Sequence, residues 1–149
     1  MRSADVAEKL SRDHPEWLRP HGALLLRLAH ESRESAVRWH VVQMLPRLGS
    51  TRTGRRRVVS LLRRFLHDDS RLVRTFNMQA LAELAAQDGA LRPTVLSMLA
   101  PLTRTGSPAM RARGKMLLRR YDWLYDWRTT VTAGAVGLDT LPAPRADEQ

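Results

Sequence analysis

Cysteine is absent from the 149-residue sequence, lysine occurs only twice, and only eight residues are aromatic. Without cysteine the chain cannot form disulfides, use a thiol nucleophile or bind a metal ion through thiolates, which is consistent with a reducing compartment. No stretch approaches 18 consecutive apolar residues, and the first residues, MRSADVAEKLSRD, are too polar for a signal peptide. We therefore expect a soluble, cytoplasmic protein with no membrane partner.

Acidic residues are scarce in the middle of the chain. Residues 52–120 contain fifteen basic residues and four acidic ones, a net charge of +11, whereas the whole chain has a net charge of +10. This charge predicts acidic partners and says little about the fold. Arginine outnumbers lysine 23 to 2, a ratio that a GC-rich genome would also produce, so composition alone gives nucleic acid only modest support. A chain of this length fits one domain that buries about 70% of its unfolded surface.

The sequence has no strand pattern, because apolar and polar residues never alternate over a bounded stretch. Apolar residues instead recur every three or four positions. In residues 54–67 one stripe consists of Val58, Leu61, Leu62, Phe65 and Leu66, and the opposite stripe consists of Arg56, Arg57, Ser60, Arg63, Arg64 and His67. These two stripes predict an amphipathic helix with an apolar side in the core and a basic side in water.

A longer period relates three segments, residues 34–48, 70–84 and 107–121, which superpose without a gap. The shared positions are an apolar residue (Val37, Val73, Met110), the arginine that follows it (Arg38, Arg74, Arg111), and a leucine seven positions further on (Leu45, Leu81, Leu118). The offsets are 36 and 37 residues, and each segment follows another apolar-striped stretch. The repeat unit is therefore a pair of helices.

Residues that typically begin or end helices lie where this repeat requires them. Ser70 and Ser107 are good N-caps, and Pro108 suits the first helical position. Three glycines, Gly49, Gly89 and Gly106, lie between elements, where a helix can end in a left-handed residue. We expect a short helix near residues 3–12, followed by three helix pairs.

The Val-Arg register, followed by small residues and a leucine, resembles the HEAT repeat family. Val41, Asn77 and Gly114 share the position at which that family has a small residue, so we expect close helix contact there. The resemblance covers about residues 15–121 and implies an all-α fold, a right-handed α-solenoid of about three antiparallel helix pairs whose second helices line a concave face. We expect a domain over residues 1–127, with repeats at about 15–49, 50–88 and 89–127, and a flexible tail over 128–149.

The repeat arginines Arg38, Arg74 and Arg111 could form a ladder for phosphates. In a HEAT-like stack, however, an arginine at this position usually bonds helix-end carbonyls or pairs with acids of the adjacent loop. The acids Glu31, Glu34, Asp68 and Asp69 are available for that pairing. We therefore expect the three arginines to be structural.

Four of the aromatic residues lie in YDWLYDW, residues 121–127. HEAT proteins with DNA glycosylase activity of the alkylation-repair type use Trp and Asp in a groove, which draws attention to Trp123, Asp126 and Trp127. The last repeat of a stack also needs a cap over its apolar end. We expect an aromatic C-terminal cap, with a partner or dimer contact as the alternative.

The expected concave surface consists of second-helix positions outside the core, namely Trp39, Gln43, Arg47, Thr75, Gln79, Glu83, Met116 and Arg120. A polar surface that includes a tryptophan suits a peptide or protein partner, because Trp and Arg are favoured as anchors of interfaces. Trp39 is expected either to take this role or to pack on the preceding repeat.

A second surface is basic. It would use Arg52, Arg55, Arg56, Arg57, Arg63, Arg64, Arg113 and Lys115 to bind an anion such as nucleic acid, with an affinity that falls steeply with salt. The alternative is a solvated helix face. Most of these arginines lie on a first helix, which would place them on the convex side.

The sequence contains no recognisable set of catalytic residues. The sequence has no Gly-rich phosphate loop, no GxSxG motif and no pair of clustered carboxylates, and His30-Glu31 is a single dyad without further metal ligands in register. We therefore expect a non-enzymatic scaffold or adaptor without metal, cofactor or small-molecule substrate. It would bind a protein or peptide with an acidic surface; the alternative is a nucleic-acid-binding module. The oligomeric state stays open.

Overall fold

The computed structural model describes residues 2–49 and 51–121, and the regular secondary structure within these residues is entirely helical. The α-helices are α1 (Arg2–Asp13), α2 (Gly22–Glu31), α3 (Ser35–Met44), α4 (Arg52–Arg64), α5 (Arg71–Gln87), α6 (Arg92–Thr105) and α7 (Pro108–Arg120). Four short 3-10 helices join them: η1 (Pro15–His21), η2 (Leu45–Leu48), η3 (Phe65–His67) and η4 (Gly89–Leu91). The expected all-α fold class is thus confirmed. The aromatic segment beyond Tyr121 and the expected tail, 128–149, lie outside the described residues.

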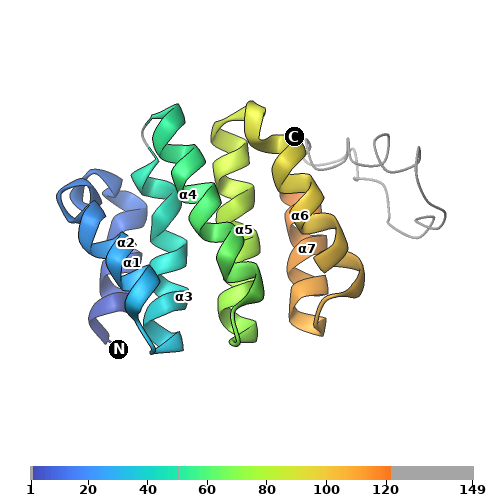
Figure 1. Ribbon diagram of the computed structural model, residues 1–149, viewed down its shortest axis with the longest axis horizontal. Helices are drawn as coiled ribbons and strands as arrows, with labels where there is room; N and C mark the ends of the chain where they lie inside the picture. The colour runs from blue at the N-terminus through green and yellow to red at the C-terminus, as the bar shows by residue number, and fades with distance from the viewer. Residues whose placement is uncertain (1, 50, 122–149) are drawn as a thin grey trace.

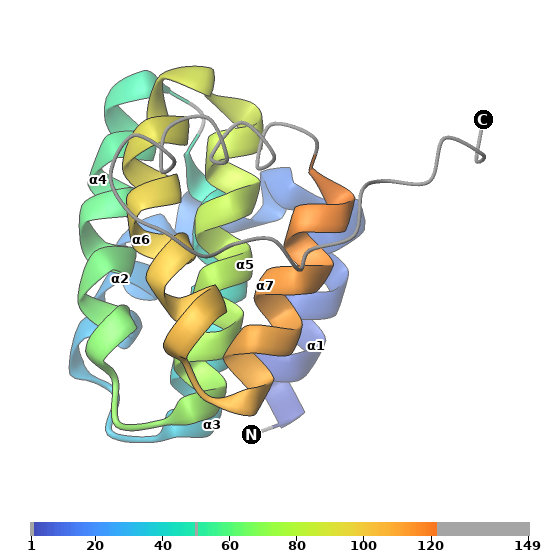
Figure 2. The same ribbon diagram turned by 90° about the vertical axis from the view of Figure 1, so that its right-hand side faces the viewer.

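The helices form two layers (Figures 1 and 2). Helices α1, α3, α5 and α7 lie side by side in one layer, and α2, α4 and α6 form the other. Each helix of the second layer packs against the helix that follows it in the chain, giving the pairs α2–α3, α4–α5 and α6–α7. The hydrophobic core lies between the layers and runs from Leu18 to Leu118.

Helix α5 is the centre of the core and has nine buried residues, among them Met78, Leu81 and Leu84. It packs against α3 on one side, α7 on the other and α4 in the opposite layer. Asn77, which is fully buried, donates a hydrogen bond from Nδ2 to the carbonyl oxygen of Leu62 (2.8 Å). The short side chain at this repeat position therefore bonds a carbonyl near the end of α4, which a buried helix end requires.

Helix α4 has the expected two sides. Val58, Leu62 and Phe65 are buried, Leu61 and Leu66 are partly buried, and the six polar residues of the opposite stripe are exposed. Val59 is also buried, which widens the apolar side beyond the expected stripe. The sequence pattern of residues 54–67 thus predicted which side of this helix faces the core.

The expected N-caps of two helices are confirmed, and Gly49 and Gly106 do follow helices, but the expected left-handed conformation of the glycines is wrong. Ser70 and Ser107 accept hydrogen bonds from the backbone N–H groups of Val73 and Met110. None of Gly49, Gly89 and Gly106 has a left-handed φ. Gly106 is extended (φ −67°, ψ 179°), and a Cβ there would collide with the carbonyl oxygen of Leu102. A glycine is needed at this position because the backbone passes close to Leu102, and not because of a left-handed turn.

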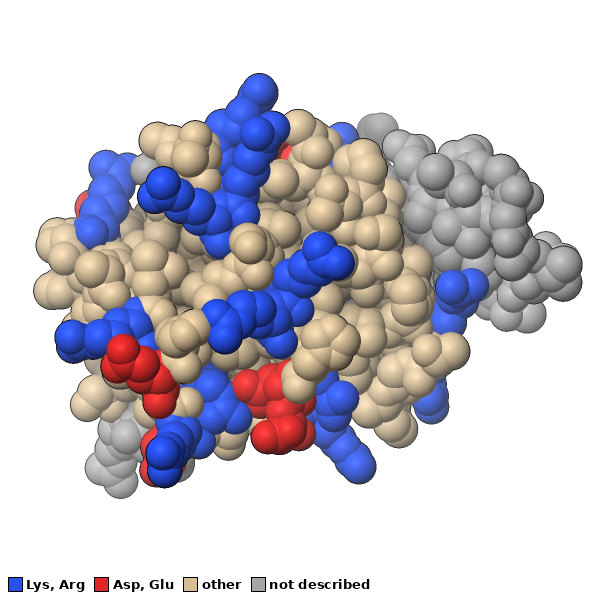
Figure 3. Space-filling view, viewed as in Figure 1, with Lys and Arg blue, Asp and Glu red and all other residues tan. Residues whose placement is uncertain are grey.

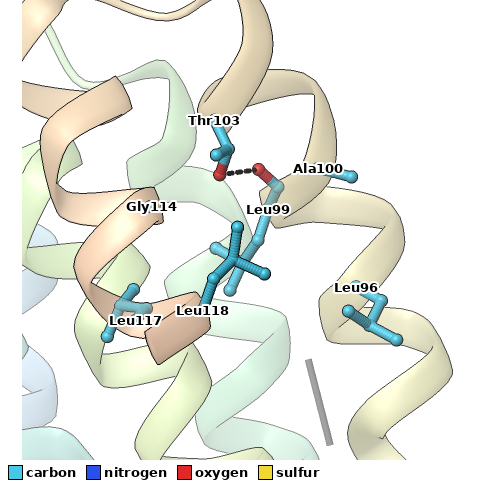
Figure 4. Close-up of a pocket in the computed structure, with 7 residues that line it drawn as sticks. All are labelled: Leu96, Leu99, Ala100, Thr103, Gly114, Leu117 and Leu118. Carbon is cyan, nitrogen blue, oxygen red and sulfur yellow. Dashed lines mark hydrogen bonds between the residues drawn. The ribbon is translucent and has the colours of Figure 1, made fainter. Parts of the chain in front are cut away.

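Gly114 also allows close contact, here between α6 and α7 (Figure 4). A Cβ at this position would overlap the side chain of Thr103, whose Oγ1 donates to the carbonyl oxygen of Leu99 (2.9 Å). Beside this contact is a cavity of only about 10 Å³, lined by apolar side chains such as Leu96 and Leu118. Because this volume barely admits a single water molecule, the cavity is a packing gap and no ligand site.

Helix α6 contains several features that weaken a helix. Pro101 lies inside it and cannot donate a backbone hydrogen bond. Ser97, Thr103 and Thr105 each donate a side-chain hydrogen bond to a carbonyl three or four residues earlier in the same helix. Such bonds compete with the backbone ladder, so α6 depends on its packing against α7 more than on its own propensity.

None of the helices in the described part of the chain combines the length and the apolar character needed to cross a bilayer.

Candidate functional site

A surface groove lies between the N-terminal halves of α5 and α7. It is lined by Arg71, Leu72, Thr75 and Phe76 of α5 and by Ala109, Ala112, Arg113 and Met116 of α7, and it encloses about 590 Å³. The lining is mostly apolar. Leu72 and Met116 are 47% and 40% exposed, which is high for large apolar side chains. The groove is therefore an apolar surface that no described residue covers.

The groove exists because the repeat positions are filled unequally. Trp39, Thr75 and Ala112 occupy the same repeat position on α3, α5 and α7. The Trp39 ring stacks on Phe76 of α5, with 4.9 Å between the ring centroids and 28° between the planes, and this fills the seam between α3 and α5. At the next seam the same two positions are occupied by Thr75 on α5 and Arg113 on α7, neither of which is aromatic. The space between α5 and α7 thus stays open where α3 and α5 are closed.

Trp39 does not pack on the preceding repeat, which was one of its two expected roles. It is half-buried, and its stacking partner belongs to the following helix pair, not the preceding one. Thr75 is also less available than expected, because it is buried and its Oγ1 donates to the carbonyl oxygen of Arg71 (2.7 Å). Thr75 is part of the groove lining, and Trp39 packs against Phe76, which is another part of that lining.

Arg113 places a positive charge at the groove. Its guanidinium carbon lies 4.9 Å from the centroid of the Phe76 ring, a cation–π contact, and its Nη1 donates to Oε1 of Gln79. No carboxylate among the described residues lies within ion-pair distance of it. Burial lowers the pKa of Arg113 and the negative charge of Glu83 partly opposes this shift, yet an arginine stays protonated at neutral pH.

Glu83 and Arg120, two other expected concave residues, lie further along the same layer. Gln79 donates from Nε2 to Oε1 of Glu83 (2.9 Å), so Arg113, Gln79 and Glu83 form a chain of hydrogen bonds. The guanidinium of Arg120, which is exposed, lies 5.6 Å from the centroid of the Tyr121 ring. The structure therefore connects Gln79, Glu83 and Met116 to one surface that includes Arg113.

The structure corrects the expectation for two concave residues of the first repeat, Gln43 and Arg47, because both are engaged by contacts within the fold. Gln43 is buried and donates to the carbonyl oxygen of Trp39 (3.2 Å). Arg47 donates from Nη2 to Oε1 of Glu8 (2.9 Å) and from Nη1 to the Ser11 hydroxyl. The reason is that α1 packs on α3, so this end of the layer is occupied by the chain itself.

Glu8 is the centre of that contact. Its side chain is 2% exposed, and Arg12 bonds both of its carboxylate oxygens at 3.0 and 2.7 Å. Burial works to raise the pKa of Glu8, but the hydrogen bonds from Arg12 and Arg47 outweigh it and hold the pKa below its ordinary value. Burial also lowers the pKa of the neighbouring His40. The stability of the α1–α3 contact should therefore depend on pH through both groups.

The three repeat arginines differ in their contacts. Arg38 donates two hydrogen bonds to the carboxylate of Asp68 (2.8 and 3.0 Å) and two to the carbonyl oxygens of Ser32 and Arg33 (3.1 and 2.8 Å). Arg111 donates to the carbonyl oxygen of Gly106 (2.8 Å). The Nε of Arg74 is buried without a hydrogen-bond partner in the described structure.

The expected basic surface is divided between the two layers, which is a second correction. Arg55 donates to Asp88 (3.3 Å) and to the carbonyl oxygen of Gly49 (3.1 Å), so it is held inside the fold. Arg113 belongs to the groove, and Lys115 is exposed on α7 in the same layer. The remaining members are exposed on α4, in the other layer: Arg52, Arg56, Arg57, Arg63 and Arg64. The spacing of charges along the chain could not reveal this division.

Sequence reasoning also missed several residues of the groove lining, among them Arg71, Leu72 and Phe76. Leu72 occupies the repeat position of Ala36 and Ala109, and Phe76 that of His40 and Arg113. The large apolar Leu72 on α5, with the small Ala109 at the same position of α7, was therefore a signal of a groove at this seam.

A second hollow of about 520 Å³ lies near the ends of α2 and α4, but its lining mixes charges. Arg38 and Asp68 already pair with one another there, and Arg64 Nη1 lies 2.9 Å from His30 Nδ1. Within residues 2–49 and 51–121, no group of three or more His, Asp or Glu side chains is placed to hold a metal ion. This hollow offers no single ligand chemistry.

Comparison of the chain with models of known protein families, with curated proteins and with solved structures gave no match.

Proposed function

We propose that the protein is a HEAT-like adaptor that binds an acidic segment of a partner protein in the groove between α5 and α7. The 36- and 37-residue repeat offsets and the three helix pairs in two layers support a right-handed solenoid of HEAT-like repeats. In that arrangement α3, α5 and α7 are the second helices, and their layer would be the concave, ligand-binding side. The groove lies in this layer.

The observation that carries the proposal is the apolar groove beside a cation, Arg113, that has no carboxylate partner among the described residues. Leu72, Phe76 and Met116 offer apolar contact area, and exposed apolar patches of this kind mark interaction sites. Arg113 rests on Phe76, and Arg71 lies on the same lining. An apolar side chain that enters the groove and a neighbouring carboxylate that reaches one of the arginines would satisfy both features.

A panel of three synthetic peptides tests this chemistry by fluorescence anisotropy. All have the same length: one combines Glu with Leu and Phe, one replaces each Glu by Lys, and one replaces Leu and Phe by Ser. We expect only the first to bind. The double variant Arg71→Glu/Arg113→Glu should invert the preference and bind the Lys peptide better by at least about 10-fold, since opposite charges then meet at the groove.

The matched control is Lys115→Glu/Arg119→Glu, which changes the net charge equally on the exposed side of α7. It should leave the preference unchanged. Equal loss of peptide binding in both double variants would contradict the proposal, because binding would then follow net charge and not the groove. Binding of the Ser peptide as tightly as the Leu/Phe peptide would contradict it as well.

A further inference from the structure

Helix α4 presents a purely basic and hydroxylated surface. Between Arg52 and Arg64 it contains six arginines and no acidic residue. Its exposed residues are Arg52, Thr53, Arg56, Arg57, Ser60, Arg63 and Arg64. In Figure 3 basic side chains gather along the middle of this face, and the larger acidic groups lie towards its lower edge. Every exposed side chain on the helix can donate a hydrogen bond, and none is apolar or aromatic.

Most of these arginines have no partner within the fold. Arg56, Arg57 and Arg63 form no hydrogen bond or ion pair with another described residue. Arg64 contacts the ring of His30, and Arg52 interacts with Asp88 only at longer range. Arg55 is the contrasting case, because its pairing with Asp88 and Gly49 withdraws it from the surface. The basic face therefore consists of charges that the fold itself does not use.

The arginines are spaced along a rigid rod. At 1.5 Å per residue, the Cα atoms of Arg52 and Arg63 are separated by about 16 Å along the helix axis. Like charges four positions apart, such as Arg52 and Arg56, repel one another and destabilise the helix by a few tenths of a kcal/mol. A linear polyanion lying along α4 would remove this repulsion and bind several arginines at once.

We propose that the exposed arginines of α4 bind the phosphate backbone of duplex nucleic acid without reading its sequence. Arginine suits phosphate because its planar guanidinium donates two parallel hydrogen bonds. Proteins that hold single strands combine basic grooves with aromatic side chains that stack on bases, and α4 exposes no aromatic residue. Attachment to a lipid surface would use exposed apolar residues beside the charges, and α4 lacks these as well.

This surface is separate from the groove. Helix α4 belongs to the α2–α4–α6 layer, and the groove is formed by α5 and α7 in the other layer (Figure 2). A duplex on α4 would leave Leu72, Phe76 and Met116 uncovered. The two proposals can therefore fail independently of one another.

The test is a salt titration of the full chain with a labelled 24-base-pair DNA duplex, followed by anisotropy. If four arginines neutralise phosphates, the logarithm of the association constant should fall with the logarithm of salt concentration with a slope of about −3.6. Between 50 and 200 mM salt this slope corresponds to about a 150-fold loss of affinity.

The decisive variant is Arg56→Gln/Arg57→Gln/Arg63→Gln. It should weaken duplex binding by at least about 10-fold and reduce the slope by about one unit for each lost contact. Its melting temperature should stay unchanged or rise slightly, since the three side chains have no partners in the fold. Binding of the acidic Leu/Phe peptide should also be unaffected.

The control variant is Arg33→Gln/Lys115→Gln/Arg119→Gln, which removes the same charge from exposed positions on other elements. It should keep nearly all of the duplex affinity. Equal weakening by both triple variants would overturn the proposal, because net charge alone would then explain binding. Absence of binding at 50 mM salt, tighter binding of the single strand, or α4-dependent binding of phosphatidylserine vesicles but not DNA would overturn it too.

Discussion

The two ends of the α1–α3–α5–α7 layer are held together by different chemistry. Towards α1, arginines are paired with carboxylates: Arg47 with Glu8 and Arg38 with Asp68. Towards α7, Arg113 contacts an aromatic ring and an amide instead. Asp68 lies in the loop after α4, and its repeat position is occupied in the next repeat by Thr105, the last residue of α6. Within residues 2–49 and 51–121, carboxylates thus pair with the arginines towards α1, and none pairs with Arg113 towards α7.

The apolar contacts of this layer also differ between its two ends: the seam nearer α1 is better filled than the seam nearer α7. The seam between α3 and α5 is filled by the Trp39 ring on Phe76, and the seam between α5 and α7 has Thr75 and Arg113 in the corresponding positions. One repeat register therefore gives a closed seam and an open one. The difference teaches that a binding surface can arise in a repeat protein by omission, where a repeat lacks the side chains that its neighbour uses for packing.

The largest effect that separates the two ends is expected for Arg38→Ala. This substitution would leave the buried carboxylate of Asp68 without its cation, and it would remove the hydrogen-bond donor to the carbonyl oxygens of Ser32 and Arg33. We therefore expect the free energy of unfolding to fall by about 2 to 4 kcal/mol. Urea unfolding measures it. Arg74→Ala is the matched variant at the same repeat position, and it should cost less than about 1 kcal/mol because no carboxylate depends on it. Equal costs would remove the distinction between the ends.

Trp39→Ala should have the next largest effect. The half-buried ring would leave a gap beside Phe76 and end their stacking, for which we expect a loss of about 2 to 3 kcal/mol in the free energy of unfolding. The same denaturant titration measures this loss. A change below 1 kcal/mol would mean that the α3–α5 seam is no better packed than the α5–α7 seam.

Acid should loosen the α1 end first. The pKa values of Glu8 and His40 are lower in the folded protein than their ordinary values of 4.5 and 6.5, so the unfolded chain binds more protons as the pH falls. Their contribution is complete above pH 6.5 and declines below it, first through His40 and then, below pH 4.5, through Glu8. Asp5, Glu8 and Lys9 are the charged neighbours that act on His40.

Unfolding curves recorded at pH 7, 6, 5 and 4 measure this decline. The variant Glu8→Gln should be less stable at pH 7 and should lose less stability on further acidification than the parent chain. An equally steep decline in the variant would assign the acid sensitivity to other groups.

The smallest effect on stability, but a large one on binding, is expected for Ala112→Trp. This variant places an indole on the α7 wall of the open seam, and the groove of about 590 Å³ has room for it. The free energy of unfolding should change by less than about 1 kcal/mol, because a surface groove can accommodate the ring without overpacking. Binding of the acidic Leu/Phe peptide should weaken by at least about 10-fold in anisotropy. Lys115→Trp, outside the groove, should leave it unchanged.

Periodicity predicted the parts of this fold that depend on local sequence. The helical class, the buried side of α4 and the caps Ser70 and Ser107 followed from spacing and capping chemistry. The groove was predicted only in part. Met116 and Gln79 were expected near a binding surface, but the stacking of Trp39 on Phe76 and the capture of Arg47 by Glu8 depend on contacts between residues more than 30 positions apart. A pattern along the chain contains no information on which of several arginines meets a given carboxylate.

Helix α6 contains an internal proline and three hydroxyl groups that donate to its own carbonyls, so we expect it to open locally before the better-packed helices. It lies with α7 at the end of the described structure, and this pair contacts the rest of the fold mainly through α5, so we expect the pair to open before α1–α5. Amide protons of this pair should therefore exchange with solvent faster than those of the buried α5. Because the groove spans α5 and α7, a bound peptide would bridge the more stable unit to the less stable one. Slower exchange in α7 would then report occupancy of the groove directly, residue by residue.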